Sequence, residues 1–357
     1  MKIPARYVSQ GKSFGNGGMG EAALYKDIPL DRLVVIKSLK AHVEKKRLLD
    51  EISALQSIRS KHVVQIYDVI PDAKGDLVGL VEEYLDGNDL TDVKPPNDLH
   101  EFLKIAFPIA RGISDIHAAG RIHRDIKRQN MKFDGEGCLK IFDFGLSRTE
   151  KVDANTVGQI GTRGYMAPEL FIPDASGKVS FTRAVDVFAF GSTCMAISLG
   201  KLPVDLKKLP PALPSAGVGF KSLPFALPAD ILMILDRCFS VAPAQRPSMA
   251  AIADLMGRHL LKDRHRALLV HSGVRYVLDA KQKVANLSVA GQGAFTITYD
   301  GFGFVVGNVA GSVFVNNMVA ANGMVLPGAC VIVLGAPALG TQRTSITVDI
   351  SHPEVST

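Results

Sequence analysis

Two short polar blocks constrain this chain more than any other feature of its sequence. The first reads His-Arg-Asp-Ile-Lys-Arg-Gln-Asn at residues 123–130, and the second reads Asp-Phe-Gly at residues 143–145. They supply a carboxylate to orient a hydroxyl, a lysine to hold a phosphate, and an amide and a second carboxylate to hold magnesium. The side chains concerned are Asp125, Lys127, Asn130 and Asp143. The fold must therefore bring two loops together, and their joint chemistry indicates phosphoryl transfer.

A glycine cluster near the start of the chain has the spacing Gly-x-Gly-x-x-Gly. It consists of Gly15, Asn16, Gly17, Gly18, Met19 and Gly20. Backbone amides in such a run can approach phosphate oxygens where a side chain would collide, although an isolated cluster is at least as often a flexible turn. The β-branched segment 34–36 follows and leads into Lys37, which strengthens the prediction of a phosphate site.

The segment 44–58 is predicted to be a helix because Leu48, Ile52 and Leu55 form an apolar stripe. Glu51 lies on the same face as this stripe. A half-buried carboxylate needs a cationic partner to offset its desolvation, and Lys37 is the candidate. The alternative is a glutamate at the rim of the helix that reaches water.

Together these blocks make the first three quarters of the chain resemble a eukaryotic-like (Hanks-type) Ser/Thr protein kinase. The resemblance implies an α+β bilobal protein kinase fold, with a β-rich N-lobe at about residues 1–85 and an α-rich C-lobe at about 86–262. It also implies ATP and Mg²⁺ as cofactors, with Mn²⁺ as a substitute, and transfer of the γ-phosphate to protein Ser/Thr hydroxyls.

The resemblance assigns a role to each polar residue of the two blocks. Asp125 would accept or orient the proton of the attacking hydroxyl, and Lys127 would steady the transferring phosphoryl group. Asn130 and Asp143 would hold magnesium. Lys37 would contact the α- and β-phosphates and pair with Glu51.

Four further residues resemble family positions that lie far apart in sequence. The block at 161–169, Gly-Thr-Arg-Gly-Tyr-Met-Ala-Pro-Glu, resembles the peptide-positioning loop of Ser/Thr kinases, in which Thr162 would reach Asp125 and Lys127. Asp186 would brace the backbone of the catalytic loop. Arg246 would pair with Glu169.

The strand and turn at residues 76–87 resemble the fifth strand and the hinge that bind adenine through backbone groups. Glu83 to Leu85 would be the hinge. Glu82 stands where the family normally has an apolar residue, and Ala22 replaces the usual valine above adenine. Either Glu82 has a buried partner or the hinge is shifted by one residue.

Arg124 precedes Asp125, as in kinases whose activation segment is ordered when a phosphate pairs with that arginine. The candidate phosphosites are Thr156, Thr149 and Ser147, with Thr156 favoured because it lies in the middle of the segment. Autophosphorylation there is expected. The segment 202–228 is rich in Pro, Leu and Ala, which predicts an irregular region for docking a peptide or a partner protein.

Composition excludes several other classes of protein. The net charge of +6 comes from basic residues scattered among acids, so nucleic-acid binding is not expected. The cysteines, Cys138, Cys194, Cys238 and Cys330, show no paired spacing, which favours reduced thiols in the cytoplasm over a zinc site or disulfides. No secretory signal or membrane span is predicted, so the chain is expected to be soluble.

Charge nearly vanishes after residue 266, and short apolar runs then alternate with Gly, Asn and Pro turns. This pattern predicts a linker at 263–270 and a small all-β sandwich at 271–357. Residues 312–317 and 326–335 resemble the closing strands of a forkhead-associated (FHA) domain. The Gly-Arg turn and the Ser-x-x-His with which FHA domains read phosphothreonine are absent from residues 266–345, so phosphopeptide reading is not expected, and a plain accessory sandwich is the alternative to an FHA-like fold. The candidate regions for a partner protein are this sandwich and the segment 202–228.

Two other functions remain open at this level. A pseudokinase scaffold would bind nucleotide or partners without phosphotransfer, and Glu82 and Ala22 keep it under consideration. A small-molecule kinase would share the His-x-Asp block and a metal-binding Asp, but the block at 161–169 disfavours it.

Overall fold

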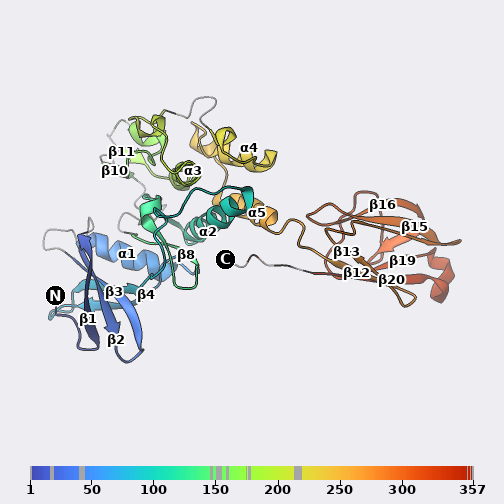
Figure 1. The fold of residues 1–357 in the computed structure, drawn as a ribbon, viewed down its shortest axis with the longest axis horizontal. Helices are drawn as coiled ribbons and strands as arrows, with labels where there is room; N and C mark the ends of the chain where they lie inside the picture. The colour runs from blue at the N-terminus through green and yellow to red at the C-terminus, as the bar shows by residue number, and fades with distance from the viewer. Residues whose placement is uncertain are drawn as a thin grey trace. The chain divides into compact units, whose positions relative to one another are not determined.

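A computed structural model describes the chain apart from residues 1, 17–19, 40–44, 145–147, 150–154, 158–160, 174, 176–177, 213–218, 352, 354 and 356–357. The chain divides into two compact units, Met1–Met256 and Gly257–Ser356 (Figure 1).

The first unit begins with a five-stranded antiparallel sheet of order β1-β2-β3-β5-β4. Its strands are β1 (Tyr7–Asn16), β2 (Gly20–Asp27), β3 (Arg32–Leu39), β4 (Ile66–Pro71) and β5 (Leu77–Glu83). On β3, Val34 and Ile36 are buried in a core with residues of the neighbouring strands. Because side chains alternate along a strand, Val35 and Lys37 face the opposite side, where they line a cavity.

Helix α1 (Lys45–Ser57) packs against β4 and β5. Leu48, Ile52 and Leu55 are buried, as the apolar stripe predicts, and Glu51 is buried with them. The predicted start of the helix at Glu44 lies outside the described residues.

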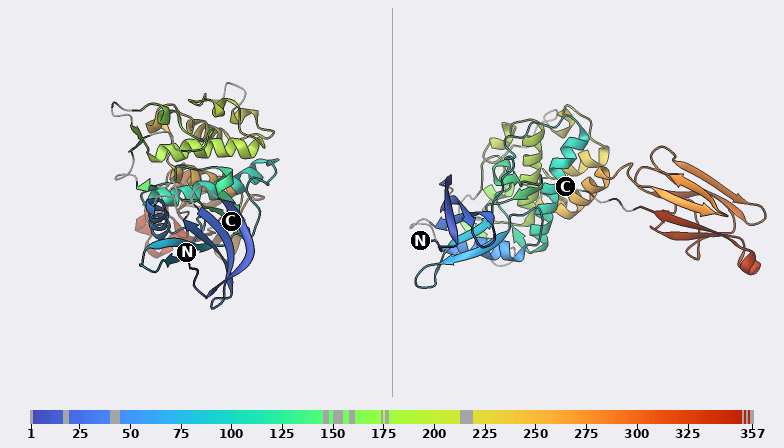
Figure 2. Two further views of the ribbon diagram at one scale, coloured as in Figure 1. Left: turned by 90° about the vertical axis from the view of Figure 1, so that its left-hand side faces the viewer. Right: turned by 60° about the horizontal axis from the view of Figure 1, so that its bottom comes forward.

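The remainder of the first unit is mainly helical, with α2 (Leu99–Ala118), α3 (Arg183–Ser198), α4 (Ala229–Arg237) and most of α5 (Met249–Leu260). Figure 2 shows these helices beyond the N-terminal sheet. Asp98 caps α2 by accepting a hydrogen bond from the Glu101 amide. Gly120, with φ +71°, ends this helical segment and turns the chain into the loop that carries Asp125.

Short elements position the loops between these helices. Three strand pairs are formed by β6 (Arg121–Ile122) with β9 (Arg148–Thr149), β7 (Met131–Phe133) with β8 (Leu139–Ile141), and β10 (Asn155–Val157) with β11 (Lys178–Ser180). Single 3₁₀ turns occur at η1 (Arg128–Asn130), η2 (Pro168–Phe171), η3 (Asp205–Lys207), η4 (Phe220–Ser222) and η5 (Pro243–Gln245). Within the segment 202–228, only η3 and η4 are regular in the described part.

A buried ion pair connects η2 to the turn before α5. The Arg246 guanidinium donates two hydrogen bonds of 2.7 Å to the Glu169 carboxylate. It also donates to the carbonyl oxygens of Ala184 and Ser240. The Arg246 side chain is fully buried, so this fork of donors joins three segments that are distant in sequence.

The second unit consists of antiparallel sheets. Its strands are β12 (Ala267–His271), β13 (Val274–Leu278), β14 (Val284–Val289), β15 (Gly293–Tyr299), β16 (Phe304–Gly311), β17 (Val313–Val315), β18 (Met318–Val319), β19 (Cys330–Leu334) and β20 (Thr344–Ile350), with one 3₁₀ segment, η6 (Pro337–Gln342). A six-stranded sheet has the order β13-β12-β20-β19-β17-β18, and a three-stranded sheet has the order β14-β15-β16. Figure 2 shows them as two layers.

Both sheets of the second unit contribute to one hydrophobic core. Phe295, Ile297 and Phe304 of the smaller sheet pack in the same cluster as Ile332 and Ile346 of the larger one. Along β20, buried and exposed side chains alternate, because every second side chain of a strand faces the same layer.

The linker predicted at 263–270 is longer than the structure allows. Strand β12 begins at Ala267 and pairs with both β13 and β20, so residues 267–270 belong to the larger sheet. Ala267 and Leu269 are buried there. In the sequence, β12 resembles part of a linker because basic residues directly precede it.

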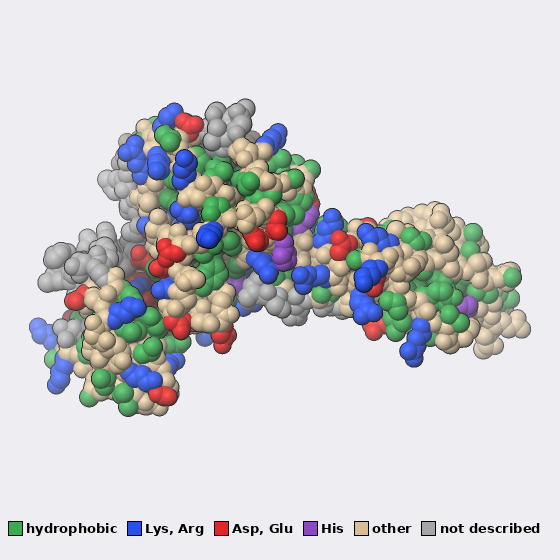
Figure 3. All heavy atoms as spheres, viewed as in Figure 1, with side chains coloured by type: hydrophobic (Ala, Val, Ile, Leu, Met, Phe, Trp, Pro, Cys, Tyr) green, Lys and Arg blue, Asp and Glu red, His purple; other side chains and the backbone are tan. Residues whose placement is uncertain are grey.

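Several global expectations can be compared with the described residues. None of the helices that the structure describes is long and apolar enough to cross a lipid bilayer. The cysteines are all free thiols, and Cys194, Cys238 and Cys330 are buried. On the face drawn in Figure 3, Lys and Arg side chains occur in several separate places, interspersed with Asp and Glu.

The substitution Arg246→Ala is expected to lower the free energy of unfolding by about 3 kcal/mol, because it removes one partner of a buried pair and leaves Glu169 unpaired. Urea denaturation followed by far-UV circular dichroism measures the change. The control is Arg237→Ala, which removes an exposed arginine with one described hydrogen bond, to the Gln245 carbonyl oxygen, and should change stability by less than about 0.5 kcal/mol. Equal effects of the two substitutions would contradict the structural role of the Arg246 pair.

Candidate functional site

The loop at residues 123–130 is held in place by a carboxylate from helix α3. Asp186 Oδ2 accepts a hydrogen bond of 2.8 Å from the His123 amide, and Asp186 Oδ1 accepts one of 2.9 Å from the Arg124 amide. His117 Nε2 lies 2.9 Å from the same carboxylate. Burial would raise the pKa of Asp186, but His117 and His123 outweigh it and hold the pKa below its usual value. A buried anion thus fixes the backbone directly before Asp125.

Asp125 lies at the centre of a polar cluster. Its Oδ2 is 2.6 Å from Lys127 Nζ, and its Oδ1 accepts a hydrogen bond of 2.6 Å from the Thr162 hydroxyl. Lys127 Nζ also donates to Thr162 Oγ1 at 2.8 Å. Burial would raise the pKa of Asp125, but the hydrogen bonds from Lys127 and Thr162 lower it below its usual value. The carboxylate is therefore ionised near neutral pH and can accept a proton.

Asn130 and Asp143 offer oxygen ligands next to this cluster. The Asn130 amide nitrogen donates to the Asp125 carbonyl oxygen at 2.8 Å and to Asp125 Oδ2 at 3.0 Å, which leaves the Asn130 amide oxygen for another partner. The Phe142 amide donates to the Asn130 carbonyl oxygen, so the two segments are adjacent. Asp143 adopts φ +66°, and the next residue, Phe144, packs edge-on against His123.

These two residues fit magnesium better than a metal held only by protein. Among the described residues, no group of three or more His, Cys, Asp or Glu side chains is placed to hold a metal ion. Magnesium commonly takes one or two protein oxygens together with substrate phosphates and water. One carboxylate from Asp143 and one amide oxygen from Asn130 match that ligand set.

Lys37 contacts two buried carboxylates. Its Nζ lies 2.9 Å from Glu51 Oε1 and 2.9 Å from Glu82 Oε2. Burial would lower the pKa of Lys37, but Glu51, Glu82 and Asp143 raise it above its usual value, so the amine is charged. Of the two readings left open for Glu82, the buried partner is the one observed, and Lys37 is that partner.

The environment of Glu82 disfavours its charged form. Burial is the main cause, and the nearby Glu51 and Asp143 add to it, although Lys37 acts in the opposite direction. The net result raises the pKa of Glu82 to about 7. One ammonium group therefore faces two carboxylates whose charges it cannot both neutralise.

A cavity of about 350 Å³ opens next to Lys37, between the N-terminal sheet and the helical part of the first unit. The predicted residues Ala22, Glu83 and Leu85 line it. Lys37, Glu82 and the predicted hinge residue Tyr84 line it as well. The lining residues that are not among the predicted site residues are Phe14, Val35, Val64, Asp89, Gln129, Lys132 and Phe142. The position of Phe14 directly before the glycine cluster is the sequence feature that could have indicated its place in the cavity.

The Phe14 ring of β1 lies near the Tyr84 ring of the predicted hinge, with centroids 5.9 Å apart. These rings supply apolar surface at the cavity, which the small Ala22 of the paired strand β2 also lines. A flat aromatic base would fit between such surfaces.

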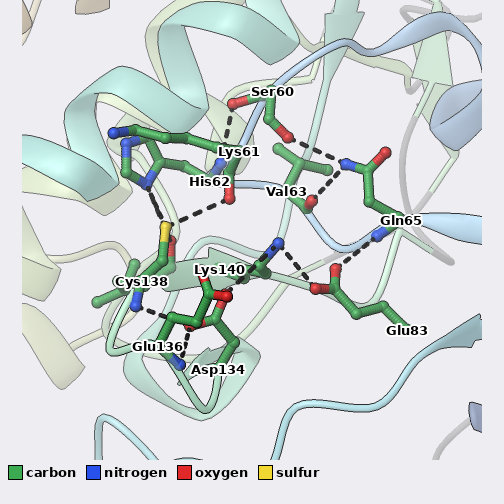
Figure 4. A network of polar contacts seen from close by, with 11 residues as sticks. Ser60, Lys61, His62, Val63, Gln65, Glu83, Asp134, Glu136, Cys138 and Lys140 are labelled. Atoms are coloured by element: carbon green, nitrogen blue, oxygen red, sulfur yellow. Dashed lines mark hydrogen bonds and ion pairs between the residues drawn. The ribbon is translucent and has the colours of Figure 1, made fainter. Parts of the chain in front are cut away.

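An ion pair between the partly buried Glu83 and the buried Lys140 holds the predicted hinge to strand β8 (Figure 4). The Glu83 carboxylate lies 2.8 Å from Lys140 Nζ, which also approaches Asp134 at 3.7 Å. The Glu83 carboxylate additionally accepts a hydrogen bond from the backbone N–H of Gln65. Burial would lower the pKa of Lys140, but Glu83 and Asp134 raise it above its usual value. Successive glutamates on β5 thus bind different lysines, Lys37 for Glu82 and Lys140 for Glu83.

The structure brings together most of the predicted site residues. Asp125, Lys127, Asn130 and Thr162 form one cluster, and Lys37, Glu51 and Glu82 form another. Gly15, Asn16 and Gly20 lie at the facing ends of β1 and β2. Gly17, Gly18, Met19 and Ser147 lie outside the described residues. Glu169 and Arg246 pair with each other away from the cavity, and the Thr149 and Thr156 backbones lie in β9 and β10.

The stability of the wild type relative to Glu82→Gln is expected to depend on pH. In the folded protein the pKa of Glu82 is raised to about 7, whereas the unfolded value is near 4.5. The folded state therefore binds more protons between these values, and the contribution of Glu82 to stability falls as pH rises from 4.5 through 7. We expect the wild type to lose roughly 1–3 kcal/mol relative to the variant over this range.

Urea denaturation of both proteins at pH 5, 6, 7 and 8 measures this difference. Above pH 8 the difference should become constant. A difference that stays level across the range, or that changes in the opposite direction, would contradict the raised pKa of Glu82.

Comparison with known proteins places these residues in context. Relatives include a probable serine/threonine-protein kinase of Dictyostelium discoideum, which is 30% identical over 252 residues, or 68% of this chain and 41% of the relative. The serine/threonine-protein kinase PknA of Corynebacterium glutamicum is 31% identical over 228 residues, or 57% of this chain and 47% of the relative. A serine/threonine/tyrosine-protein kinase of Arabidopsis thaliana is 27% identical over 266 residues, or 70% of this chain and 65% of the relative.

The chain thus spans less than half the length of the first two of these relatives. The family model described as the protein kinase domain matches residues 8–256, which include both polar clusters and the cavity that Lys37 lines. Since this match covers well over half of the sequence, the chain belongs to the protein kinase family.

Proposed function

We propose that this protein is a Ser/Thr protein kinase that transfers the γ-phosphate of ATP to protein Ser or Thr hydroxyls. The observation that carries the proposal is the cluster of Asp125, Lys127 and Thr162, in which an ionised carboxylate contacts both a lysine and a hydroxyl. This is the arrangement needed to hold a proton acceptor and a phosphate-binding cation at one point.

ATP would bind in the cavity beside Lys37. Its adenine would contact the backbone of residues 83–85 and lie between the apolar surfaces of Phe14 and Leu85. Lys37 would contact the α- and β-phosphates, and Glu51 would hold the amine in position. Magnesium held by Asp143 and Asn130 would neutralise charge on the phosphates.

In the transfer step, a substrate hydroxyl oxygen forms a bond to the γ-phosphorus, and the bond from that phosphorus to the β,γ-bridging oxygen breaks. The hydroxyl proton passes to Asp125, and ADP leaves with the bond electrons. Lys127 lies beside Asp125 and would offset the negative charge on the transferring group. Thr162 orients the carboxylate through the hydrogen bond that it donates to Oδ1.

The choice of Ser/Thr over Tyr as acceptor rests on Lys127 and Thr162. The bond between their side chains ties the predicted peptide-positioning loop to the catalytic loop. A peptide lying along this loop would bring a short Ser or Thr hydroxyl close to Asp125. The relatives from Dictyostelium discoideum and Corynebacterium glutamicum are named as serine/threonine-protein kinases, which supports the same choice.

For the second unit we propose an FHA-like β-sandwich that binds a partner protein. The support is the packing of a six-stranded and a three-stranded antiparallel sheet around one core. The absence of a Gly-Arg turn from residues 266–345 argues against phosphopeptide binding as its main role.

A nucleotide-binding scaffold is the alternative to a kinase. The contact between Glu82 and Lys37 favours this alternative, because the contact occupies the amine that would bind phosphate.

A labelling experiment distinguishes the kinase from the scaffold. It measures transfer of labelled γ-phosphate from ATP and Mg²⁺ to the protein itself and to a generic basic protein substrate. We expect label on Ser or Thr with the wild type and a loss on the order of 100-fold or more in Asp143→Asn, because several kcal/mol of charge stabilisation disappear.

Asp31→Asn is the control, since the Asp31 side chain is 92% exposed and pairs only with Lys26 among the described residues. It should label like the wild type. Nucleotide binding without label in either the wild type or the control would refute the kinase and support the scaffold.

Phosphate is expected on Thr156 after incubation with ATP and Mg²⁺, and not in Asp143→Asn. The Thr156 backbone lies in strand β10, paired with Val179 of β11. Phosphate there adds a charge that an arginine such as Arg124 can pair with. Peptide mass spectrometry checks this, and kinase-dependent phosphate found only outside residues 146–163 would refute it.

A further inference from the structure

Glu82 is a buried carboxylate that the transfer step does not use. Its side chain is 3% exposed and lines the cavity, and Lys37 Nζ lies within 3.1 Å of both of its oxygens. Lys37 Nζ is also 2.9 Å from Glu51 Oε1. Glu82 belongs to β5 and Glu51 to α1, so the amine is held from two sides.

The charges around Lys37 do not balance. One ammonium group faces Glu51 and Glu82, and Asp143 contributes a further negative charge nearby. The phosphates of a nucleotide are themselves anionic and need the same amine. In a buried site, each added negative charge makes anion binding less favourable.

We propose that Glu82 acts through Lys37, for which it competes with the phosphates of a nucleotide. This competition weakens the binding of phosphate-bearing nucleotides relative to the bare nucleoside. This inference rests on the proposed function, in which Lys37 contacts the phosphates of ATP. In the protein without nucleotide, the Lys37 amine contacts both Glu51 and Glu82, and it must leave Glu82 in order to bind phosphate.

The alternative is that Glu82 supports Lys37 in the position that phosphate needs, as Glu51 is proposed to do. The two readings predict opposite signs. Removing a competitor strengthens phosphate binding, whereas removing a support weakens it. Adenosine carries no phosphate, so neither effect should appear with it.

Protonation of Glu82 provides an independent control of the competition. The groups that face it are Lys37 from β3, Glu51 from α1 and Asp143 after β8. Burial with these neighbours raises the pKa of Glu82 to about 7, so the carboxyl is mostly neutral at pH 6 and mostly charged at pH 8. Competition should therefore be weak at pH 6 and strong at pH 8.

The test is isothermal titration calorimetry of the full chain with ADP and, separately, with adenosine, without metal, at pH 6 and pH 8. Because most of Glu82 is charged at pH 8, Glu82→Gln should bind ADP several-fold more tightly than the wild type at that pH. At pH 6 the two proteins should bind ADP within about twofold, since most of the carboxyl is already neutral. Adenosine affinity should be the same in both proteins at both pH values.

Asp27→Asn is the matched control for loss of a buried carboxylate from the same sheet. Asp27 is buried and pairs with Arg6, away from the cavity. Its ADP-to-adenosine affinity ratio should equal that of the wild type. Glu82→Met, which removes the hydrogen-bonding group as well as the charge, should tighten ADP binding as Glu82→Gln does, and thermal unfolding verifies that each variant is folded.

Weaker or unchanged ADP binding in Glu82→Gln at pH 8, or an equal change for adenosine, would overturn the inference. Absence of ADP binding in both the wild type and the variant would overturn it as well. The labelling experiment tests the proposed function separately. If label is transferred to Ser or Thr but ADP binding does not depend on Glu82, the kinase activity is supported and the competition is refuted. If ADP binding tightens in Glu82→Gln but no label is transferred, the competition is supported and the kinase activity is refuted.

Discussion

The anchoring of Asp186 is the interaction on which the site depends. A fully buried carboxylate must find donors, and here they are the amides of His123 and Arg124 and the ring of His117. Meeting that demand holds Arg124 in a conformation with φ +70°, which few non-glycine residues adopt. The orientation of Asp125 therefore depends on the need of the buried Asp186 carboxylate for hydrogen-bond donors.

The N-terminal sheet shows the same dependence of the site on packing. The alternation that buries Val34 and Ile36 in the core sends Val35 and Lys37 to the cavity. Glu51 is likewise placed by the apolar stripe of α1. A shift of one residue in the register of β3 would therefore remove the amine from the cavity and polar groups would enter the core.

The sequence predicted those features that depend on local spacing. The loops around Asp125 and Asp143 and the burial of Glu51 follow from short motifs and one helical period. The contact between Glu83 and Lys140, and the role of Phe14 in the cavity, depend on which distant segments meet, so a single sequence did not reveal them. Glu82 was recognised as unusual, but its partner required the tertiary structure. Strand β12 was missed because its flanking charges resemble a linker.

The ion pair between Glu83 and Lys140 has a mechanical consequence. Lys140 lies on β8, the strand that leads into Asp143, while Glu83 ends β5 of the N-terminal sheet. Pulling the sheet directly away from the rest of the first unit would separate two charges in a poorly hydrated place, whereas a rotation about this contact keeps them together. The ion pair is therefore expected to resist separation of the N-terminal sheet from β8 more strongly than a rotation about residues 83 and 140.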